Sequence, residues 1–378
     1  MSKLNISRLT NENEDGSPKI TGITTFSSTA FLEAPKGTTA QRPTNPLPGA
    51  IRFNTDGGHL EYYTGEFWDE VLVANNSLDG GNRGLFGGGV STPAPSATIS
   101  NVIDYITIST TGNASDFGDL TGSARYGTSS CSSSTRGLFG GGTTPGFVIS
   151  NIIDYVTISS TGNASDFGDL LNTTEFLSAC SSSTRGIFGA GNTPTSTNTI
   201  QYVTIASNGV NAVDFGDLLT GKGTPAGACS SSTRGVFGGG NVPADNNVIE
   251  FITIATLGNS LDFGDLTTPR GRGGSCSNST RGLFAGGSTP TGSNVIDYIT
   301  IASTGNAQDF GDLISSGFDY AACSSSTRGI FVAGSTGPVS NVIEYVTILS
   351  TGNAIDFGDL TVARRAVLGG CSNGHGGL

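Results

Sequence analysis

Residues 131–142 read CSSSTRGLFGGG, residues 151–158 read NIIDYVTI and residues 163–170 read NASDFGDL, and versions of this series recur along most of the chain. The Arg-Gly step of the copies falls at Arg83, Arg136, Arg185, Arg234, Arg281 and Arg328, at intervals of 53, 49, 49, 47 and 47 residues. A period near 50 residues indicates a repeat architecture, and it is the length of one four-stranded propeller blade. The repeat therefore predicts the fold before any single residue is considered.

Each copy divides into four short segments with the composition of strands. Small residues surround Cys131, the Arg-Gly segment ends in glycines, residues 151–158 are β-branched and aromatic, and residues 165–170 follow a Thr-Gly-Asn turn. Small residues suit strands crowded round an axis, and a strand that is apolar on both faces suits a sheet between two neighbours. These features predict four antiparallel strands per copy.

The two ends of the array are incomplete in complementary ways. The first copy begins at Arg83 with Leu78 where its cysteine would stand, and residues 366–373 form a cysteine segment with no successor. Joining them would complete a sixth blade and remove an exposed sheet edge. We therefore predict an all-β protein in which residues 81–378 form a six-bladed β-propeller closed by a C-terminal strand. A small β-rich N-terminal segment over residues 1–80 would precede it.

The order of the segments resembles the blade of kelch proteins. A small strand is followed by Arg-Gly, an apolar residue, Phe and a double glycine such as Gly141-Gly142 or Gly239-Gly240, and then by an Asp/Glu-Tyr/Phe strand. The last strand departs from the kelch pattern, because it carries Phe167 or its equivalents where kelch blades usually have Trp. The resemblance implies a kelch-like fold, and not membership of a particular kelch family.

The composition argues against several classes of function. A net charge of −12 does not provide the basic surface that binding to nucleic acid or an anionic membrane needs. No apolar run is long enough for a transmembrane helix, and no signal peptide is recognisable, so we expect folding in a cytoplasm. Each copy holds one cysteine at the same place, and equivalent positions in a ring would point alike and not toward one another, so we expect buried free thiols. The six are Cys131, Cys180, Cys229, Cys276, Cys323 and Cys371. Their spacing fits no zinc motif, and we expect no other metal and no cofactor.

Motifs that suggest catalysis are better explained as structure. The repeated Asp-Phe-Gly lacks the catalytic and phosphate-binding loops of a kinase. Residues 114–118 loosely resemble the Asp-box of sialidases but lack its terminal Thr-Trp, and the two histidines, His59 and His375, lie outside the repeats. No nucleophile, base and oxyanion site can be assembled from these residues, so we predict no enzyme. A glycan-cleaving propeller remains the alternative from another class.

The Arg of each Arg-Gly step recurs alongside the second Asp of Asp-Phe-Gly-Asp. A bidentate Arg–carboxylate pair that locks neighbouring blades together would explain this recurrence, whereas isolated exposed charges are the alternative. The structural candidates are Arg136, Arg185, Arg234, Arg281, Arg328, Asp119, Asp169 and Asp217.

The copies differ from one another mainly in the loops of one face. The Ser-Ser-Ser-Thr-Arg and Ser-Thr-Gly-Asn-Ala turns hardly vary, whereas the loops between the second and third strands and those between successive copies do. Aromatic and charged side chains on loops over a rigid scaffold are typical of recognition surfaces, although unconstrained drift would also diversify loops. The ligand- or receptor-binding candidates are Arg125, Tyr126, Glu175, Phe176, Lys222, Arg270, Arg272, Phe318, Asp319 and Tyr320.

The N-terminal segment has a different composition. Residues 11–16 are polar, residues 38–46 predict an extended stretch held by prolines, and residues 49–63 predict a β-hairpin around Asp-Gly-Gly that residues 66–71 would complete. So small a segment has too little core to be strongly stable alone, so we expect it to gain stability from partners.

The sequence of residues 36–73, with GTTAQRP, IRFNTD, LEYYTG and a Trp, resembles a module of tailed-phage virion proteins, including those of cyanobacterial phages. The resemblance implies a virion structural protein, assembled in the host cytoplasm, that binds other virion proteins through its N-terminal segment. The propeller would then contact host-surface glycan or protein, or a neighbouring subunit, as part of a tail fibre. A capsid or neck decoration is the alternative. A fibre would suit a homotrimer, although no coiled-coil heptads support one.

Overall fold

A computed structural model describes residues 34–56, 59–71, 82–91, 98–241, 244–289, 291–332, 334, 336, 338–366 and 369–378. The chain forms two compact units, an N-terminal unit (Met1–Asn75) and a repeat unit (Asn76–Leu378). The described residues form strands and one short 3-10 helix, with no α-helix among them, so the protein is all-β there. The polar stretch over residues 11–16 lies outside the described residues.

The N-terminal unit holds one four-stranded sheet. Its strands are β1 (Lys36–Gly37), β2 (Ile51–Asn54), β3 (His59–Tyr63) and β4 (Trp68–Glu70), in that order, with β1 parallel to β2. The antiparallel pairing of β2 with β3 and of β3 with β4 confirms the predicted hairpin and its third strand. The prediction of an extended stretch over residues 38–46 was wrong at its start, because η1 (Thr39–Gln41) is a 3-10 turn in which Thr38 and Gln41 form a capping box.

This small sheet buries a polar cluster on one face. Glu61 accepts hydrogen bonds from Arg42, Arg52 and Asn54, and these partners hold the pKa of its carboxyl down at about 2 against the effect of burial. The opposite face carries apolar side chains that are half exposed or nearly so, with Ile51 at 54%, Phe53 at 37% and Tyr62 at 36%. The alternation of the strands thus turns their apolar residues toward the outside of this unit.

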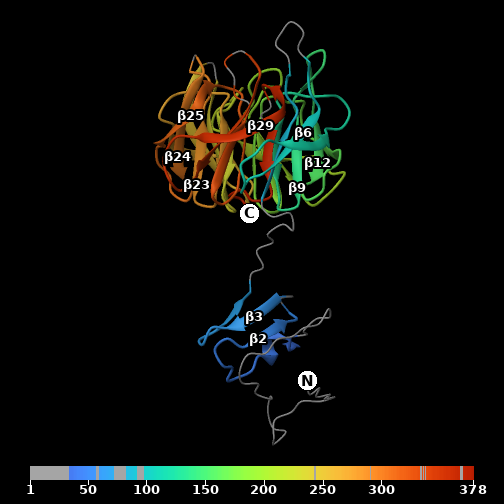
Figure 1. Ribbon diagram of the computed structural model, residues 1–378, viewed down its shortest axis with the longest axis vertical. Coiled ribbons are helices and arrows are strands. Elements are labelled where there is room, and N and C mark those ends of the chain that lie inside the picture. Colours follow the sequence, from blue (N-terminus) through green and yellow to red (C-terminus); the bar gives the residue numbers. More distant parts are fainter. Residues whose placement is uncertain are drawn as a thin grey trace, which may run out of the picture. The chain divides into compact units, whose positions relative to one another are not determined.

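The repeat unit contains six four-stranded antiparallel sheets of the same order, in a propeller-like arrangement (Figure 1). The first strands are β8 (Ser129–Ser132), β14 (Ser178–Ser181), β18 (Gly227–Ser230), β22 (Gly274–Ser277), β26 (Ala321–Ser324) and β30 (Gly369–Ser372). The second strands are β9 (Arg136–Gly140), β15 (Arg185–Gly189), β19 (Arg234–Asn241), β23 (Arg281–Ala285), β27 (Arg328–Val332) and β5 (Arg83–Gly87). Strand β30 pairs with β5, so the C-terminal and first-copy strands share a sheet.

The outer half of each sheet follows the same plan. The third strands are β12 (Ile152–Thr157), β16 (Thr199–Thr204), β20 (Asp245–Thr253), β24 (Ser293–Thr300), β28 (Ser340–Thr347) and β6 (Val102–Thr107). The fourth strands are β13 (Ser165–Asp169), β17 (Val213–Asp217), β21 (Leu261–Asp265), β25 (Gln308–Gly317), β29 (Ile355–Arg364) and β7 (Ser115–Asp119). A two-stranded ribbon, β10 (Thr143–Thr144) with β11 (Val148–Ile149), extends one loop.

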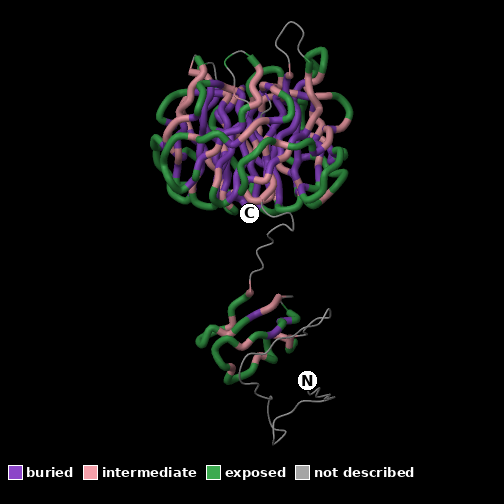
Figure 2. Tube along the Cα trace, viewed as in Figure 1, coloured by how far each residue is buried: buried purple, intermediate pink, exposed green. Residues whose placement is uncertain are grey.

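The apolar core lies between neighbouring sheets, and the interior of the unit is buried (Figure 2). One representative cluster joins Leu138 and Phe167 of one sheet to Phe188 and Val203 of the next. In each sheet the aromatic residue of the third strand meets the Phe of the fourth edge-on, as Tyr155 meets Phe167 at 6.2 Å between ring centroids.

All six cysteines are free and buried, as predicted, and each thiol lies against the Arg-Gly glycine of a neighbouring sheet. A Cβ atom at Gly186 would lie 2.6 Å from Cys131 Sγ, so any side chain at this position would displace the sulfur. The pairs are Gly84 with Cys323, Gly137 with Cys371, Gly186 with Cys131, Gly235 with Cys180, Gly282 with Cys229 and Gly329 with Cys276. Burial raises the pKa of each thiol, to about 12 in Cys180, so the sulfurs act as packing atoms.

The inner strands are linked by their serines. Ser181 Oγ donates to the Ser132 carbonyl oxygen at 2.7 Å, and the same bond recurs from each inner strand to the next until Ser132 Oγ donates to the Ser372 carbonyl at 2.6 Å. The C-terminal tail crosses this end of the inner strands, where Gly376 N–H donates to the Ser277 carbonyl. His375 is half-buried there, and its pKa falls to about 4 because burial disfavours the charged ring.

The predicted pairing of the Arg-Gly arginines with Asp119, Asp169 and Asp217 was wrong. Arg136 instead donates to the Ile205 carbonyl oxygen of the next sheet at 3.1 Å and lies 4.9 Å from the centroid of the Tyr155 ring. Arg185, Arg234, Arg281 and Arg328 make the equivalent bonds and ring contacts. These arginines therefore do join neighbouring sheets, but through a backbone carbonyl of the next sheet, while each guanidinium lies over the aromatic ring of its own sheet.

Candidate ligand-binding face

The two ends of the sheets differ in structure: one end holds the contacts between neighbouring sheets, and the other carries the variable loops. At one end, the turn that reads Thr-Gly-Asn-Ala in most copies binds the outer strand of the preceding copy, as Gly162 N–H donates to the Phe117 carbonyl and Asn163 Oδ1 accepts from the Asp119 N–H. A Cβ atom at Gly118 would lie 2.5 Å from the backbone of Gly162, which explains the glycine of Asp-Phe-Gly. These nearly constant turns are therefore joints between sheets, and the variable loops gather at the other end.

Several loop cations on the variable face are buried, contrary to their predicted role as exposed contacts. Arg125 pairs with Asp154, Arg270 with Asp297 at 2.9 Å, and Lys222 with Glu250 at 3.0 Å. All six side chains are essentially inaccessible to solvent. They pin each loop to the third strand of its own sheet and present nothing to a ligand in this conformation. Arg364 forms the same pair with Asp104.

Sequence reasoning missed these pairs, but comparison of the copies contains the signal. Where the loop carries a cation, the third strand carries an acid, and where the loop has Thr174, the third strand has the neutral Gln201. Glu344 is the exception, because its copy has no loop cation at the equivalent position. Burial consequently raises the pKa of Glu344 to about 7.

Five of the predicted residues do come together, around one recess of about 480 Å³. We call this the aromatic recess and define it by Tyr126, Phe147, Phe176, Arg272, Phe318 and Asp319. Tyr126 and Phe176 meet edge-on at 6.1 Å between centroids, and the Arg272 guanidinium lies 4.2 Å from the centroid of Phe318. Phe147 was not predicted; it stands on the ribbon turn with 82% of its surface exposed.

Arg272 and Asp319 form the polar part of the recess. Arg272 Nε donates to Asp319 Oδ1 at 2.8 Å, and Nη2 binds Oδ2, which makes the pair bidentate. Burial raises the pKa of Asp319, and the guanidinium opposes this rise. The Asp319 side chain is 3% exposed and the Arg272 side chain 35%, so only the arginine is open to a ligand.

The backbone of the recess is held in an uncommon conformation. Five non-glycine residues that line it have positive φ: Phe147 (62°), Phe176 (54°), Arg272 (59°), Asp319 (62°) and Ala366 (52°). Elsewhere in the described residues only Ala190 does so. Strain of this kind persists where the surroundings fix it, and it concentrates at functional sites.

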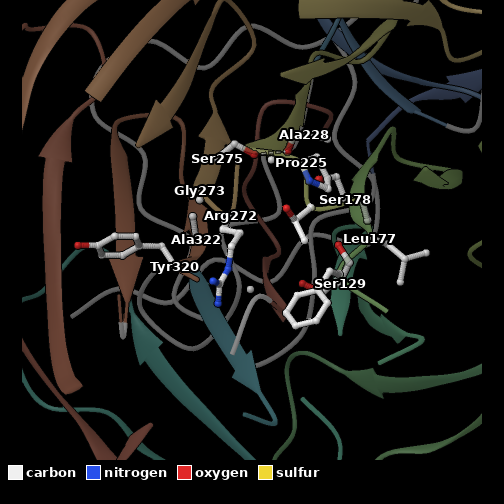
Figure 3. Close-up of a pocket in the computed structure, with 17 residues that line it drawn as sticks. Ser129, Leu177, Ser178, Pro225, Ala228, Arg272, Gly273, Ser275, Tyr320 and Ala322 are labelled. Carbon is white, nitrogen blue, oxygen red and sulfur yellow. Dashed lines mark hydrogen bonds between the residues drawn. The ribbon is translucent and has the colours of Figure 1, made fainter. Parts of the chain in front are cut away.

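The other two predicted residues lie beside the recess. Glu175 accepts a hydrogen bond from Thr143 Oγ1. Tyr320 is buried and donates its hydroxyl to the Ser315 carbonyl at 2.8 Å, and burial raises its pKa. Figure 3 shows Arg272 projecting inward among the small residues of the inner strands, whereas the Tyr320 ring points away from them. Tyr320 therefore packs between sheets and does not face a ligand.

The cavities along the inner strands are much smaller. One, next to Arg272 and Phe176, has a volume of about 40 Å³, and another, among the cysteines, serines and His375, about 50 Å³. These volumes suit a few water molecules and not an organic ligand. The described residues contain no group of three or more His, Cys, Asp and Glu that could hold a metal ion.

No protein-family model matches the chain, and no curated protein matches it either. In the described part of the chain, no helix has the length and apolar character that a membrane crossing requires. Evidence on function therefore comes from the geometry above.

Proposed function

We propose that the chain is a structural protein of a tailed-phage virion that displays a binding face. In this proposal the repeat unit is a six-bladed kelch-like β-propeller closed by its C-terminal strand. The common order of the six sheets, the β30–β5 pairing and the serine bonds that run from strand to strand support it. The resemblance of residues 36–73 to phage virion modules supports the assignment to a virion.

The aromatic recess is the observation that carries the binding function. It combines an apolar wall, one accessible guanidinium and strained backbone on loops over a rigid scaffold, which is the usual design of a ligand site. Contacts to a host-surface ligand from a single recess would be weak, and display of many copies on one particle would raise their combined affinity. A tail fibre or another tail-associated part is the location that this role requires.

The N-terminal unit supports the attachment role. Its sheet presents Ile51, Phe53 and Tyr62 on one face, and an apolar sheet face of this kind is suited to contact with another protein. The buried Glu61 cluster on the opposite face holds the strands in register and leaves the apolar face outward. We propose that this face binds another virion protein.

Negative-stain imaging of phage particles that carry this chain, labelled with an antibody against the repeat unit, tests the proposal. Label at the tail tip or fibres is the expected result. Label over the head or neck would replace the host-binding role with a decoration role. Purified particles that contain none of the chain would overturn the virion assignment altogether.

A further inference from the structure

We propose that the aromatic recess binds an uncharged pyranose ring, such as one unit of a neutral surface polysaccharide. The inference rests on the binding face proposed above and names its ligand. A pyranose has an apolar face of C–H groups and a rim of oxygen atoms. The recess offers a matching pair of surfaces, namely aromatic rings and an arginine with unused donors.

The walls of the recess are suited to a flat ring with an apolar face. Tyr126, Phe176 and Phe318 are half-buried at its side, and Phe147 is open to solvent at its mouth. The half-buried rings already contact one another or Arg272, so they are ordered before a ligand arrives. Preordered apolar surface lowers the entropy that binding costs.

The polar contribution comes from Arg272. Its Nε and Nη2 atoms bind Asp319, whereas Nη1 has no hydrogen-bond partner among the described residues. Nη1 therefore offers two N–H donors whose direction the bidentate pair fixes. Since Asp319 is almost inaccessible, the recess presents these donors and not the carboxylate, and donors select a ligand rich in oxygen acceptors.

The charges around the recess select an uncharged ligand. Arg272 and Arg365 line it, Asp319 is bound to Arg272, and Asp245 lies within electrostatic range of Arg272. Glu175 lies within electrostatic range of Tyr126, so two positive and three negative charges surround the recess, and their net charge is −1. An anion would gain little from a guanidinium that is already paired, and a cation would face the two arginines.

The site is assembled by the backbone of several loops. At one loop position, the residue donates its N–H to the carbonyl of the preceding loop in several copies, as Phe176 does to Gly127 at 2.8 Å and Asp319 does to Arg272 at 2.6 Å. These bonds fix the positive φ of Phe176 and Asp319. The recess therefore keeps its shape without a ligand.

Binding of the full-length protein to neutral pyranose oligosaccharides, followed by saturation-transfer NMR and calorimetry, tests the inference. We expect binding by the wild type that changes little between low and physiological salt, because no net charge is paired. Phe147→Ala and Phe318→Leu should each weaken it about three- to tenfold, by loss of a stacking face. Phe67→Ala removes a ring of 57% exposure in the N-terminal unit and is the matched control.

Three outcomes would overturn the inference. Wild-type protein could bind no neutral oligosaccharide at millimolar concentration, it could bind only charged ones, or both recess variants could bind as well as the control. Phe147→Ala should also leave the oligomeric state unchanged, and a shift in sedimentation would mean that the recess holds a second copy of the chain. Sugar binding with no label on virions would retain the recess and reject the phage assignment, so the two failures are distinguishable.

Discussion

The contact between each cysteine and the glycine of the neighbouring sheet leads to a quantitative prediction. In Gly186→Ala the new Cβ would lie 2.6 Å from Cys131 Sγ and 3.3 Å from Val203 Cγ2. Favourable contacts between heavy atoms begin at about 3.5 Å, so the methyl group would be about 0.9 Å too close to the sulfur. Overpacking of this kind costs about 1–3 kcal/mol.

Removal of the sulfur should relieve the clash. Cys131→Ala alone deletes one buried atom and should cost about 1 kcal/mol. In the double variant the new methyl group fills the vacated space, so its cost should be close to that of Cys131→Ala alone. The coupling energy should therefore equal the cost of Gly186→Ala alone, about 1–3 kcal/mol, in the range found for residues in contact.

Thermal unfolding of the full-length protein, followed by circular dichroism, measures these effects. The only tryptophan, Trp68, lies in the N-terminal unit, so its fluorescence would not report on the repeat unit. Gly186→Ala should lower the midpoint of the repeat-unit transition by several degrees, at about 2–4 °C for each kcal/mol. Cys229 faces Gly282 and not Gly186, so Cys229→Ala combined with Gly186→Ala is the matched control, and its effects should add. Equal rescue by the two cysteine variants would refute the reasoning.

Three further predictions concern buried groups. Burial raises the pKa of Glu344 from 4.5 to about 7, so the folded state keeps a proton that the unfolded chain loses, and stability should fall as the pH rises through 7. The wild-type protein should lose about 1 kcal/mol of unfolding free energy between pH 6.5 and 8.5, and Glu344→Gln should lose less. An unchanged pH dependence in that variant would show that Glu344 is not the group that titrates. Glu250→Gln is the control, and it should destabilise at both pH values because it leaves the Lys222 ammonium without its charged partner. Arg125→Met should lower the unfolding free energy by about 3–5 kcal/mol, because it leaves the Asp154 carboxylate buried and unpaired. In a denaturant titration, addition of Asp154→Leu should restore part of the lost stability. No recovery would show that the broken ion pair does not cause the loss. The six thiols should not react with a thiol reagent in the folded protein and should all react in denaturant, and rapid labelling of the native state would show that the cores between sheets open readily.

Much of the fold could be predicted from the sequence because the repeats are local. Four strands and three turns lie within one period, and the composition of each strand suits its place in a sheet, as with the small residues around Cys131. The half-repeats at Arg83 and Cys371 indicated which strands share a sheet, since each lacks what the other supplies. The 3-10 turn at Thr39–Gln41 was missed because the prolines that follow it suggested an extended chain.

The roles of charged residues were harder to predict, because burial depends on neighbours far along the chain. Arg125 and Arg272 occupy loops of the same class, yet one is buried against Asp154 and the other opens into the recess. The Thr174–Gln201 substitution could have revealed the buried pairs, since a loop that loses its cation cannot leave an acid in the third strand without cost. The Arg-Gly arginines carry no such signal, because a backbone carbonyl is present whatever the residue.

The aromatic recess illustrates how a repeated scaffold makes one site and not six. The joints at the nearly constant end are repeated because each copy must bind the next. The recess takes Tyr126, Phe176, Arg272 and Phe318 from different loops at the variable end, and these loops differ from one another at the positions that line it. Substitutions in these loops leave the joints unchanged, so the variable end can diversify around one recess while the scaffold keeps its stability. The effect of Phe147→Ala on sugar binding, with an unchanged melting temperature, would separate these two properties in one protein.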